Sequence, residues 1–240
     1  MNKRILAIVL CLMMALGCAM AEKSDTAWSL VVDEIVVGDG TTKVSLNPSV
    51  EVLLGREGAG FWTQISLLLD GVSAGAVQAQ MDGSTIQVSA DGAKDYLTIE
   101  GTDTFLQQYG VEAEELLDEL DDLMEEMEEM EEHGFVEADE LDDLNEIPGM
   151  TVELLSENSF RVTMEQDAIN VSFRLSWNRL DGGKPFDLSV KNPCRYTYRE
   201  MYPGDGTDIP DALSAALNAL LMDGTVQEAV ALFGEPVLDM

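Results

Sequence analysis

Apolar and polar positions alternate with a period of two through much of the chain, which is typical of half-buried β-strands. Between residues 61 and 100, the pairs Asp70-Gly71, Asp82-Gly83 and Asp91-Gly92 interrupt this alternation. Asp-Gly readily adopts the positive φ angles of a type I′ hairpin turn. The pattern therefore predicts an antiparallel meander over residues 28–100, with one apolar and one polar face.

The same alternation returns after residue 150. It predicts strands at 152–155 and 160–164, and a long strand that carries Ile169, Val171, Phe173, Leu175 and Trp177 on one side. A turn at 181–183 leads to a further expected strand at 186–190, and Tyr196 and Tyr198 indicate a last one.

Helical spacing is predicted for the C-terminal part, over about 209–233. Asp208 and Pro210 begin the first helix, whose apolar face carries leucines 213, 217, 220 and 221, and Gly224 is expected to end it. Thr225 and Glu228 are spaced as a capping box for a second, short helix.

An acidic insertion at about 111–147 separates the two β-rich parts. Residues 112–146 hold 19 acidic residues and no Lys or Arg. Apolar residues recur there in three- and four-residue steps, which predicts a helical hairpin with one apolar side. We expect that side to dock on the strand at 169–177, either as core or as a lid over a ligand. The residues of this stripe are Leu116, Leu117, Leu120, Leu123, Met124 and Met127, which would face Phe173 and Trp177.

These elements predict an α+β fold in which helices pack on one face of a twisted antiparallel sheet. We expect one domain over residues 22–240. The pattern leaves open whether the sheet is an incomplete barrel or part of a sandwich.

The N-terminus has the features of an export signal. Residues 2–4 carry two positive charges, residues 5–16 are apolar, and Ala19-Met20-Ala21 fits a cleavage site. Residues 1–21 are therefore expected to be a signal peptide and the protein to be secreted or at the cell surface. Leu16-Gly17-Cys18 resembles a lipobox, so a lipid anchor on Cys18 is the alternative. Only Cys194 remains after residue 21, which leaves no pair for an internal disulfide.

Net charge excludes one class of partner. The chain has 46 acidic and 13 basic residues, a formal charge of −33, so binding to nucleic acid phosphates is not expected. Apolar residues make up 46% of the sequence, which is enough for a packed core. No membrane-spanning stretch is expected after residue 21.

No resident cofactor or metal is predicted. The acidic helix is expected to be a solvated face with at most weak binding of divalent cations, because no EF-hand loop is present. Met124, Met127, Met130 and His133 are soft or imidazole ligands three residues apart. Each three-residue step turns a helix by about 60°, so the first and last would face opposite sides, and core packing is the better interpretation.

Support for catalysis is thin. Residues 71–75 read Gly-Val-Ser-Ala-Gly, the letters of a nucleophile elbow around Ser73, but no long helix is expected to follow. The chain's one histidine, His133, would have to act as the base. Cys194 has no evident partner, so we expect no enzyme. Trp28, Trp62 and Trp177, with nearby tyrosines, could instead form a sugar platform, although core packing is the commoner role of such residues.

The order of elements, namely a leader, a run of hairpins over 61–100, a helical interruption and a return to strand over 152–190, resembles that of LolA/LppX-type carriers. The resemblance implies a curved sheet partly closed by helices, with a lipid or lipoprotein ligand between them. Two functions are thus expected: a non-catalytic exported protein that binds an apolar molecule or a protein partner, or a structural or adhesive surface module, such as a sugar-binding sandwich.

Overall fold

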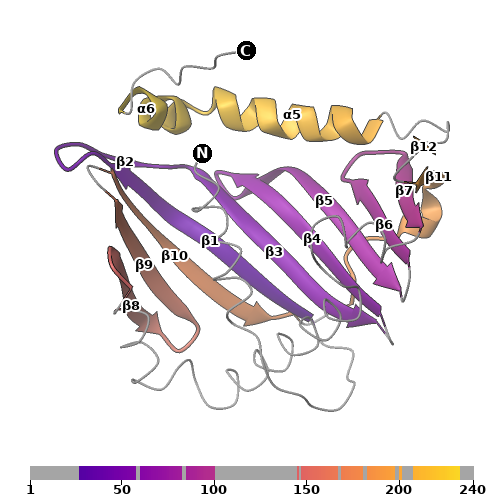
Figure 1. Ribbon diagram of the computed structural model, residues 1–240, viewed down its shortest axis with the longest axis horizontal. Helices are drawn as coiled ribbons and strands as arrows, with labels where there is room; N and C mark the ends of the chain where they lie inside the picture. The colour runs from indigo at the N-terminus through magenta and orange to yellow at the C-terminus, as the bar shows by residue number, and fades with distance from the viewer. Residues whose placement is uncertain are drawn as a thin grey trace.

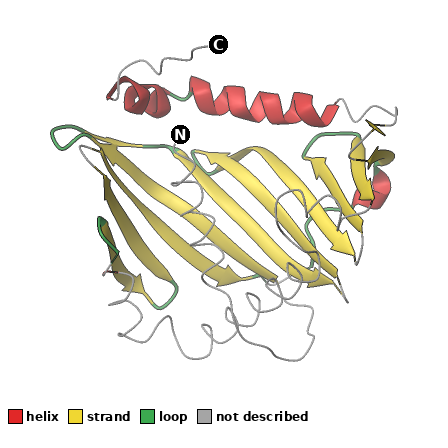
Figure 2. Ribbon diagram, viewed as in Figure 1, coloured by secondary structure: helices red, strands yellow, loops and turns green. Residues whose placement is uncertain are grey.

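The computed structural model describes residues 27–57, 60–82, 85–100, 145, 147–166, 169–180, 183–197, 200–201 and 208–232. In this part of the chain, 12 strands form a single open sheet, and two α-helices lie end to end along one rim of it (Figures 1 and 2). The α+β class with a twisted sheet is confirmed, and the described strands form one sheet rather than a sandwich of two.

The elements follow the predicted order closely. The first β-rich part contains β1 (Ala27–Gly38), β2 (Lys43–Ser45), β3 (Pro48–Glu57), β4 (Gly60–Leu69), β5 (Val72–Asp82), β6 (Thr85–Ala90) and β7 (Asp95–Glu100). The second contains β8 (Met150–Ser156), β9 (Ser159–Gln166), β10 (Ile169–Arg179), the 3₁₀ helix η1 (Leu188–Val190), β11 (Asn192–Thr197) and β12 (Glu200–Met201). The helices are α5 (Asp208–Met222) and α6 (Gly224–Leu232).

Two of the Asp-Gly turns differ in geometry. Asp70 and Gly71 both have positive φ, 51° and 76°, as the type I′ prediction requires. At the turn between β6 and β7, Gly92 has a φ of 77° but Asp91 does not lie in the positive region. That connection spans residues 91–94 and is therefore not a two-residue type I′ hairpin, although a turn is present as predicted.

The first strand lies in the interior of the sheet. The strand order is β12-β11-β7-β6-β5-β4-β3-β1-β10-β9-β8, with β2 paired to β1. The second meander, β8–β10, thus extends the sheet on the free side of β1. The chain then returns to the other edge, where β11 pairs with β7 in parallel. The predicted antiparallel pairing thus holds for every other described strand pair, and β11 with β7 is the exception.

The return crossing is the strap, defined here as residues 183–191. A strand was expected at 186–190, and this was wrong: the segment is irregular and ends in η1. Its alternating apolar residues have another cause. Phe186 and Leu188 are buried against Trp62 on the sheet, while Val190 is 80% exposed.

The C-terminal helices contact the sheet at its rim. Helix α5 packs on β5, β6 and β7, and α6 packs near β1 and β2. The buried positions of α5 are Ile209 and Ala216, whereas Leu217 and Leu221 are exposed, so the leucine side is not the packed one. Small residues are needed at the contact because Ala216 meets Gly75 of β5: a Cβ added to Gly75 would lie 2.6 Å from the Ala216 Cβ.

The predicted capping box of α6 is also corrected. Asp223, not Thr225, caps the helix: its Oδ1 accepts hydrogen bonds from the amides of Thr225 at 2.9 Å and Val226 at 3.2 Å. The Thr225 hydroxyl donates to the same Asp223 Oδ1 and accepts a 2.9 Å bond from the Asn47 amide between β2 and β3. This bond ties α6 to the sheet.

The sheet has two chemically distinct faces. Register partners share a face, so one row of the apolar face runs through Trp177, Leu30, Val52, Ile65 and Val77. The opposite, polar face carries Ser29, Glu51, Gln64 and Gln78 in the corresponding positions. One edge of the sheet is capped by a side chain: the Asn145 amide pairs with both the N–H and the C=O of Val152 in edge strand β8.

Candidate ligand-binding face

The polar face is closed by the strap. Trp62 of β4 lies over Gly55, where a Cβ would come within 2.2 Å of the indole, and Phe186 of the strap stacks edge-on against Trp62 with ring centroids 6.1 Å apart. Lys184 Nζ binds Glu57 at 2.7 Å and Gln80 Oε1 at 2.9 Å. These contacts span three neighbouring strands, so the strap lies across this face.

A second strap lysine is held more deeply. Lys191 Nζ donates to Ser89 Oγ at 2.7 Å, to the carbonyl of Ala90 at 2.8 Å and to Gln78 Oε1 at 3.3 Å. Ser89 is fully buried. Burial lowers the pKa of Lys191 below its ordinary value, while the charges of Asp91 and Asp208 act in the opposite direction. These three bonds use all three protons of the ammonium group, so the role of Lys191 is structural.

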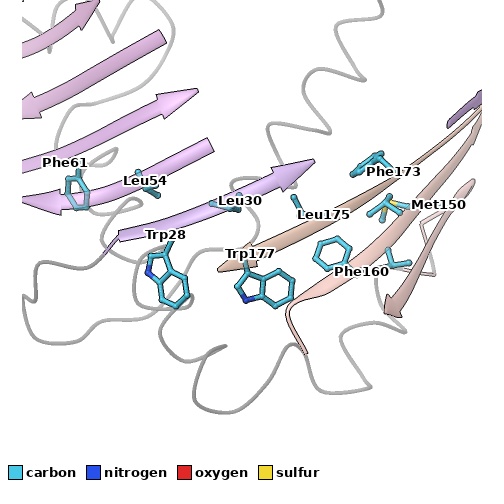
Figure 3. Close-up of a cluster of buried hydrophobic side chains, with 11 residues drawn as sticks. Trp28, Leu30, Leu54, Phe61, Met150, Phe160, Phe173, Leu175 and Trp177 are labelled. Atoms are coloured by element: carbon cyan, nitrogen blue, oxygen red, sulfur yellow. The ribbon is translucent and has the colours of Figure 1, made fainter. Parts of the chain in front are cut away.

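The apolar face is packed at its β8–β10 side. Eleven buried residues form one cluster there, and they come from six strands (Figure 3). Phe160 and Trp177 contact each other with ring centroids 5.9 Å apart. The members are Trp28, Leu30, Leu54, Phe61, Met150, Val152, Phe160, Val162, Phe173, Leu175 and Trp177.

The middle of the apolar face is less covered. Ile65 lies in β4, which is the sixth strand from either end of the strand order, and is nevertheless 44% exposed. Its register partners Val52 and Val77 are only partly buried. The two described helices contact the rim on either side: α5 packs at β5–β7 and α6 near β1 and β2. Among the described residues, apolar side chains at the centre of this large sheet are therefore only partly covered.

One polar atom within the packed side lacks a partner. Trp28 is 1% exposed, and no residue in the described ranges accepts a hydrogen bond from its Nε1. Trp28 pairs in register with Leu54 and Arg179. Arg56, two residues after Leu54, lies over the Phe61 ring at 5.3 Å. This end of the apolar face thus combines an indole N–H with two arginines.

A charged cluster joins the two meanders on the polar face. Arg174 of β10 binds both carboxylate oxygens of Asp33 in β1, and its Nη1 lies 2.8 Å from Glu34 Oε1. Arg161 of β9 reaches the other oxygen of Glu34 at 3.0 Å. Glu34 has a φ of 48° at the point where the β1–β10 register shifts, so the bulge turns its carboxylate toward both arginines. All four charged side chains of the cluster are paired, and their role is to link β1 to β9 and β10.

Two of the predicted site residues fall in the described part of the chain. Phe173 and Trp177 lie on the apolar face, 9% and 4% exposed, in the same cluster. The stripe residues Leu116, Leu117, Leu120, Leu123, Met124 and Met127 lie outside the described residues, as do Met130, His133 and the leader with Cys18. Their predicted docking remains a prediction.

The other candidates have ordinary positions. Ser73 lies within strand β5, beside a register shift opposite Leu67 and Leu68, and not at a turn from strand to helix as an elbow requires. Cys194 is buried in β11. The three tryptophans are all buried, Trp28 and Trp177 on one face and Trp62 on the other, so they form no common exposed platform.

Sequence reasoning missed the two most informative residues. Ile65 belongs to an alternation, Phe61, Thr63, Ile65 and Leu67, that predicted the face but not how much of it is covered. The N–H of Trp28 has no acceptor in the part of the chain that the structure describes. This depends on neighbours brought together from distant strands, and no local pattern signals it.

Within the described residues, no helix is long and apolar enough to span a bilayer, and no group of three or more His, Cys, Asp or Glu side chains gathers as metal ligands would. Comparison of the sequence with models of known protein families and with curated proteins finds no match. A functional assignment therefore has to be argued from the geometry of the apolar face itself.

Proposed function

We propose that this chain is an exported, non-catalytic binding protein that holds an apolar molecule on the apolar face of its sheet. The observation that carries the proposal is the 44% exposure of Ile65 at the centre of that face. In a two-layer domain, such a position is normally buried by the second layer. Exposed apolar surface of this kind is typical of binding sites.

The two faces differ in what they can accept. On the polar face, the strap already satisfies the polar side chains, with Lys184 and Lys191 bonded to Gln80 and Gln78. The apolar face around Ile65 offers Val52, Val77 and the neighbouring Leu67, all partly exposed. Such a surface gains free energy by contact with hydrocarbon and offers little to a sugar or a nucleotide.

The free energy gained by burying a hydrocarbon chain on this face is large enough for a carrier. Burying a chain of about twelve methylenes contributes roughly 10 kcal/mol at about 0.8 kcal/mol per CH₂. Loss of translational and rotational freedom opposes this by roughly 4 kcal/mol or more. A net value near 6 kcal/mol corresponds to a dissociation constant on the order of tens of micromolar. The element-order resemblance to LolA/LppX-type carriers supports the same class of ligand.

A substitution at Ile65 tests the proposal. The Ile65→Glu variant places a charge where the ligand would lie, and we expect it to weaken binding of the apolar dye N-phenyl-1-naphthylamine at least tenfold. Gln64→Glu is the matched control, because Gln64 is the adjacent residue on the polar face and a carboxylate can still accept from Gln78. Circular dichroism checks that both variants fold. Equal dye binding by the wild type and both variants would refute the proposal.

Native mass spectrometry of the purified protein provides an independent test. A carrier is expected to retain a co-purifying lipid-sized mass that organic extraction removes. The same spectrum gives the N-terminus: a chain that begins at Glu22 supports cleavage and secretion, whereas an acylated chain that begins at Cys18 supports an anchor. Unchanged esterase background in Ser73→Ala is expected for a protein without catalysis.

A further inference from the structure

Strand β8 is the last strand in the described order of the sheet, and it pairs with β9 on one side. In an antiparallel strand, the N–H and C=O of every second residue point to the same side. Both groups of Val152 bond to Asn145, so Val152 belongs to the set that points away from β9, together with Met150 and Leu154. Edges of this kind readily pair with strands of other chains.

The side chain of Asn145 takes the place of a strand residue at this edge. Its Oδ1 accepts a hydrogen bond from the Val152 N–H at 2.7 Å, and its Nδ2 donates to the Val152 carbonyl at 3.3 Å. A residue of a neighbouring antiparallel strand would exchange the same two bonds, because the asparagine amide has the same donor and acceptor as a peptide group. The Val152 N–H has one proton, so no incoming strand can pair there while Asn145 is bound.

The two halves of this edge differ in how they are protected. In the first half, the Met150 N–H donates to the Ile147 carbonyl at 3.0 Å, so this donor is satisfied within a turn. In the second half, Leu154 and Leu155 are 44% and 39% exposed. Residues 150–156 contain no Lys or Pro, which natural edge strands often use against pairing with other chains. Asn145 is thus the side chain placed to protect the middle of the strand.

We propose that Asn145 blocks the middle of β8 against a second copy of this chain. A second copy is the occupant that this edge favours, because two identical strands can pair antiparallel around a two-fold axis. With Val152 at that axis, Glu153 of one chain lies opposite Thr151 of the other, so the two acidic side chains do not face each other. The proposal concerns assembly and does not depend on the proposed function.

Removing the asparagine amide tests the proposal on the full-length protein. The Asn145→Ala variant frees both pairing groups of Val152, and the sheet stays folded because water replaces the lost bonds at an edge. We expect sedimentation velocity to show a dissociation constant for dimer formation at least tenfold lower than that of the wild type. The experiment is run in about 0.5 M NaCl, which screens the repulsion between chains of formal charge −33. Asn170→Ala is the matched control, because Asn170 bonds to Glu165 within the β9–β10 hairpin and should leave association unchanged.

Hydrogen exchange and a double variant locate the contact. The Val152 amide of Asn145→Ala should exchange faster than in the wild type at low protein concentration and regain protection as dimers form. Adding Leu154→Lys places a charge in the proposed contact and should return association to the wild-type level. Unchanged exchange at Val152, or faster exchange without increased dimer formation, would overturn the proposal. Association that persists in the double variant, or that Asn170→Ala produces equally, would also overturn it, because the contact would then lie elsewhere.

Discussion

The guanidinium group of Arg174 holds the carboxylate of Asp33 by two parallel hydrogen bonds, Nε to Oδ1 at 2.8 Å and Nη2 to Oδ2 at 2.6 Å. The two residues are register partners on β10 and β1, the strands at which the two meanders meet. The bond with Asp33 is the main reason that the pKa of Arg174 is raised further above its ordinary value, so the guanidinium group stays charged at any working pH.

Replacing Arg174 by Lys should therefore weaken the join between the meanders. A lysine keeps the charge but cannot form the two parallel bonds. Because the side chains are 35% and 26% exposed, solvent screening limits the loss to about 1 kcal/mol in the free energy of unfolding. Urea denaturation measures it. Arg161→Lys is the control, since Arg161 makes a single, more exposed bond to Glu34 and should change stability by less than about 0.5 kcal/mol.

Lys191 fastens the strap to the sheet. Its replacement by Met keeps the aliphatic stem but removes the lysine donor from Gln78 Oε1 and from the buried Ser89 Oγ, whereas the carbonyl of Ala90 still accepts from the Ala93 amide. We expect a loss of about 1–3 kcal/mol, the usual cost of unpaired buried polar groups. Lys184→Met should cost less than about 1 kcal/mol, because its partner Glu57 is 67% exposed. If thermal denaturation ranks these two variants the other way, the strap is held mainly by Lys184.

Gly75 of β5 and Ala216 of α5 form the closest contact described between the sheet and this helix. The Gly75→Ala variant places a methyl group 2.6 Å from the Ala216 Cβ, which should cost about 1–3 kcal/mol by overpacking. Ala216→Gly alone should cost about 1 kcal/mol through helix propensity. The double variant should be more stable than the sum of the two losses predicts, because the clash is removed. Additive losses in this double-mutant cycle would mean that α5 does not rest on Gly75.

The cap of α6 should respond to acid. The Thr225 hydroxyl is the main cause of the lowered pKa of Asp223, helped by the amides of Val226 and Thr225 and by Asn47. Because the folded-state pKa lies below that of the unfolded chain, the cap's stabilisation is complete above about pH 3.9 and is lost as pH falls through the folded value. Amide exchange of residues 224–232 should thus be constant from pH 7 to about pH 5 and lose protection below about pH 4.

The Asp223→Asn variant is the control for this prediction. Asparagine still caps a helix through its side-chain oxygen but does not titrate. Its α6 amides should therefore show no loss of protection at acid pH. A profile identical to that of the wild type would assign the transition to another carboxylate.

Local patterns predicted the elements well and their partners less well. The alternation in residues 169–177 and the positive φ angles at Asp70-Gly71 depend on neighbours in sequence, so both were predictable. The strap imitates a strand because Phe186 and Leu188 alternate, yet they are apolar for contact with Trp62, which lies far away in sequence. Similarly, Asp223 rather than Thr225 caps α6, and the Thr225 hydroxyl donates to Asp223 Oδ1 while accepting from the distant Asn47 amide.

The candidate site was predicted only in part, because some of its features depend on contacts between residues that are distant in sequence. Periodicity placed Phe173 and Trp177 on an apolar face, and both lie there. How much of that face is exposed at Ile65 depends on the sum of contacts from many strands, as does the lack of an acceptor for Trp28 among the described residues. Such sums have no signature in a single stretch of sequence.

The interior position of β1 has a consequence for the order of synthesis. One side of β1 pairs with β3, which follows within a few residues, but the other side pairs with β10 at residues 169–179. As the chain emerges from its N-terminus, the second edge of β1 stays open until most of the protein has been made. Open strand edges readily pair with other chains, so the growing protein passes through an extended interval in which it is prone to aggregate. Chains that stop before residue 169 should keep this edge exposed, and for them the interval would never end.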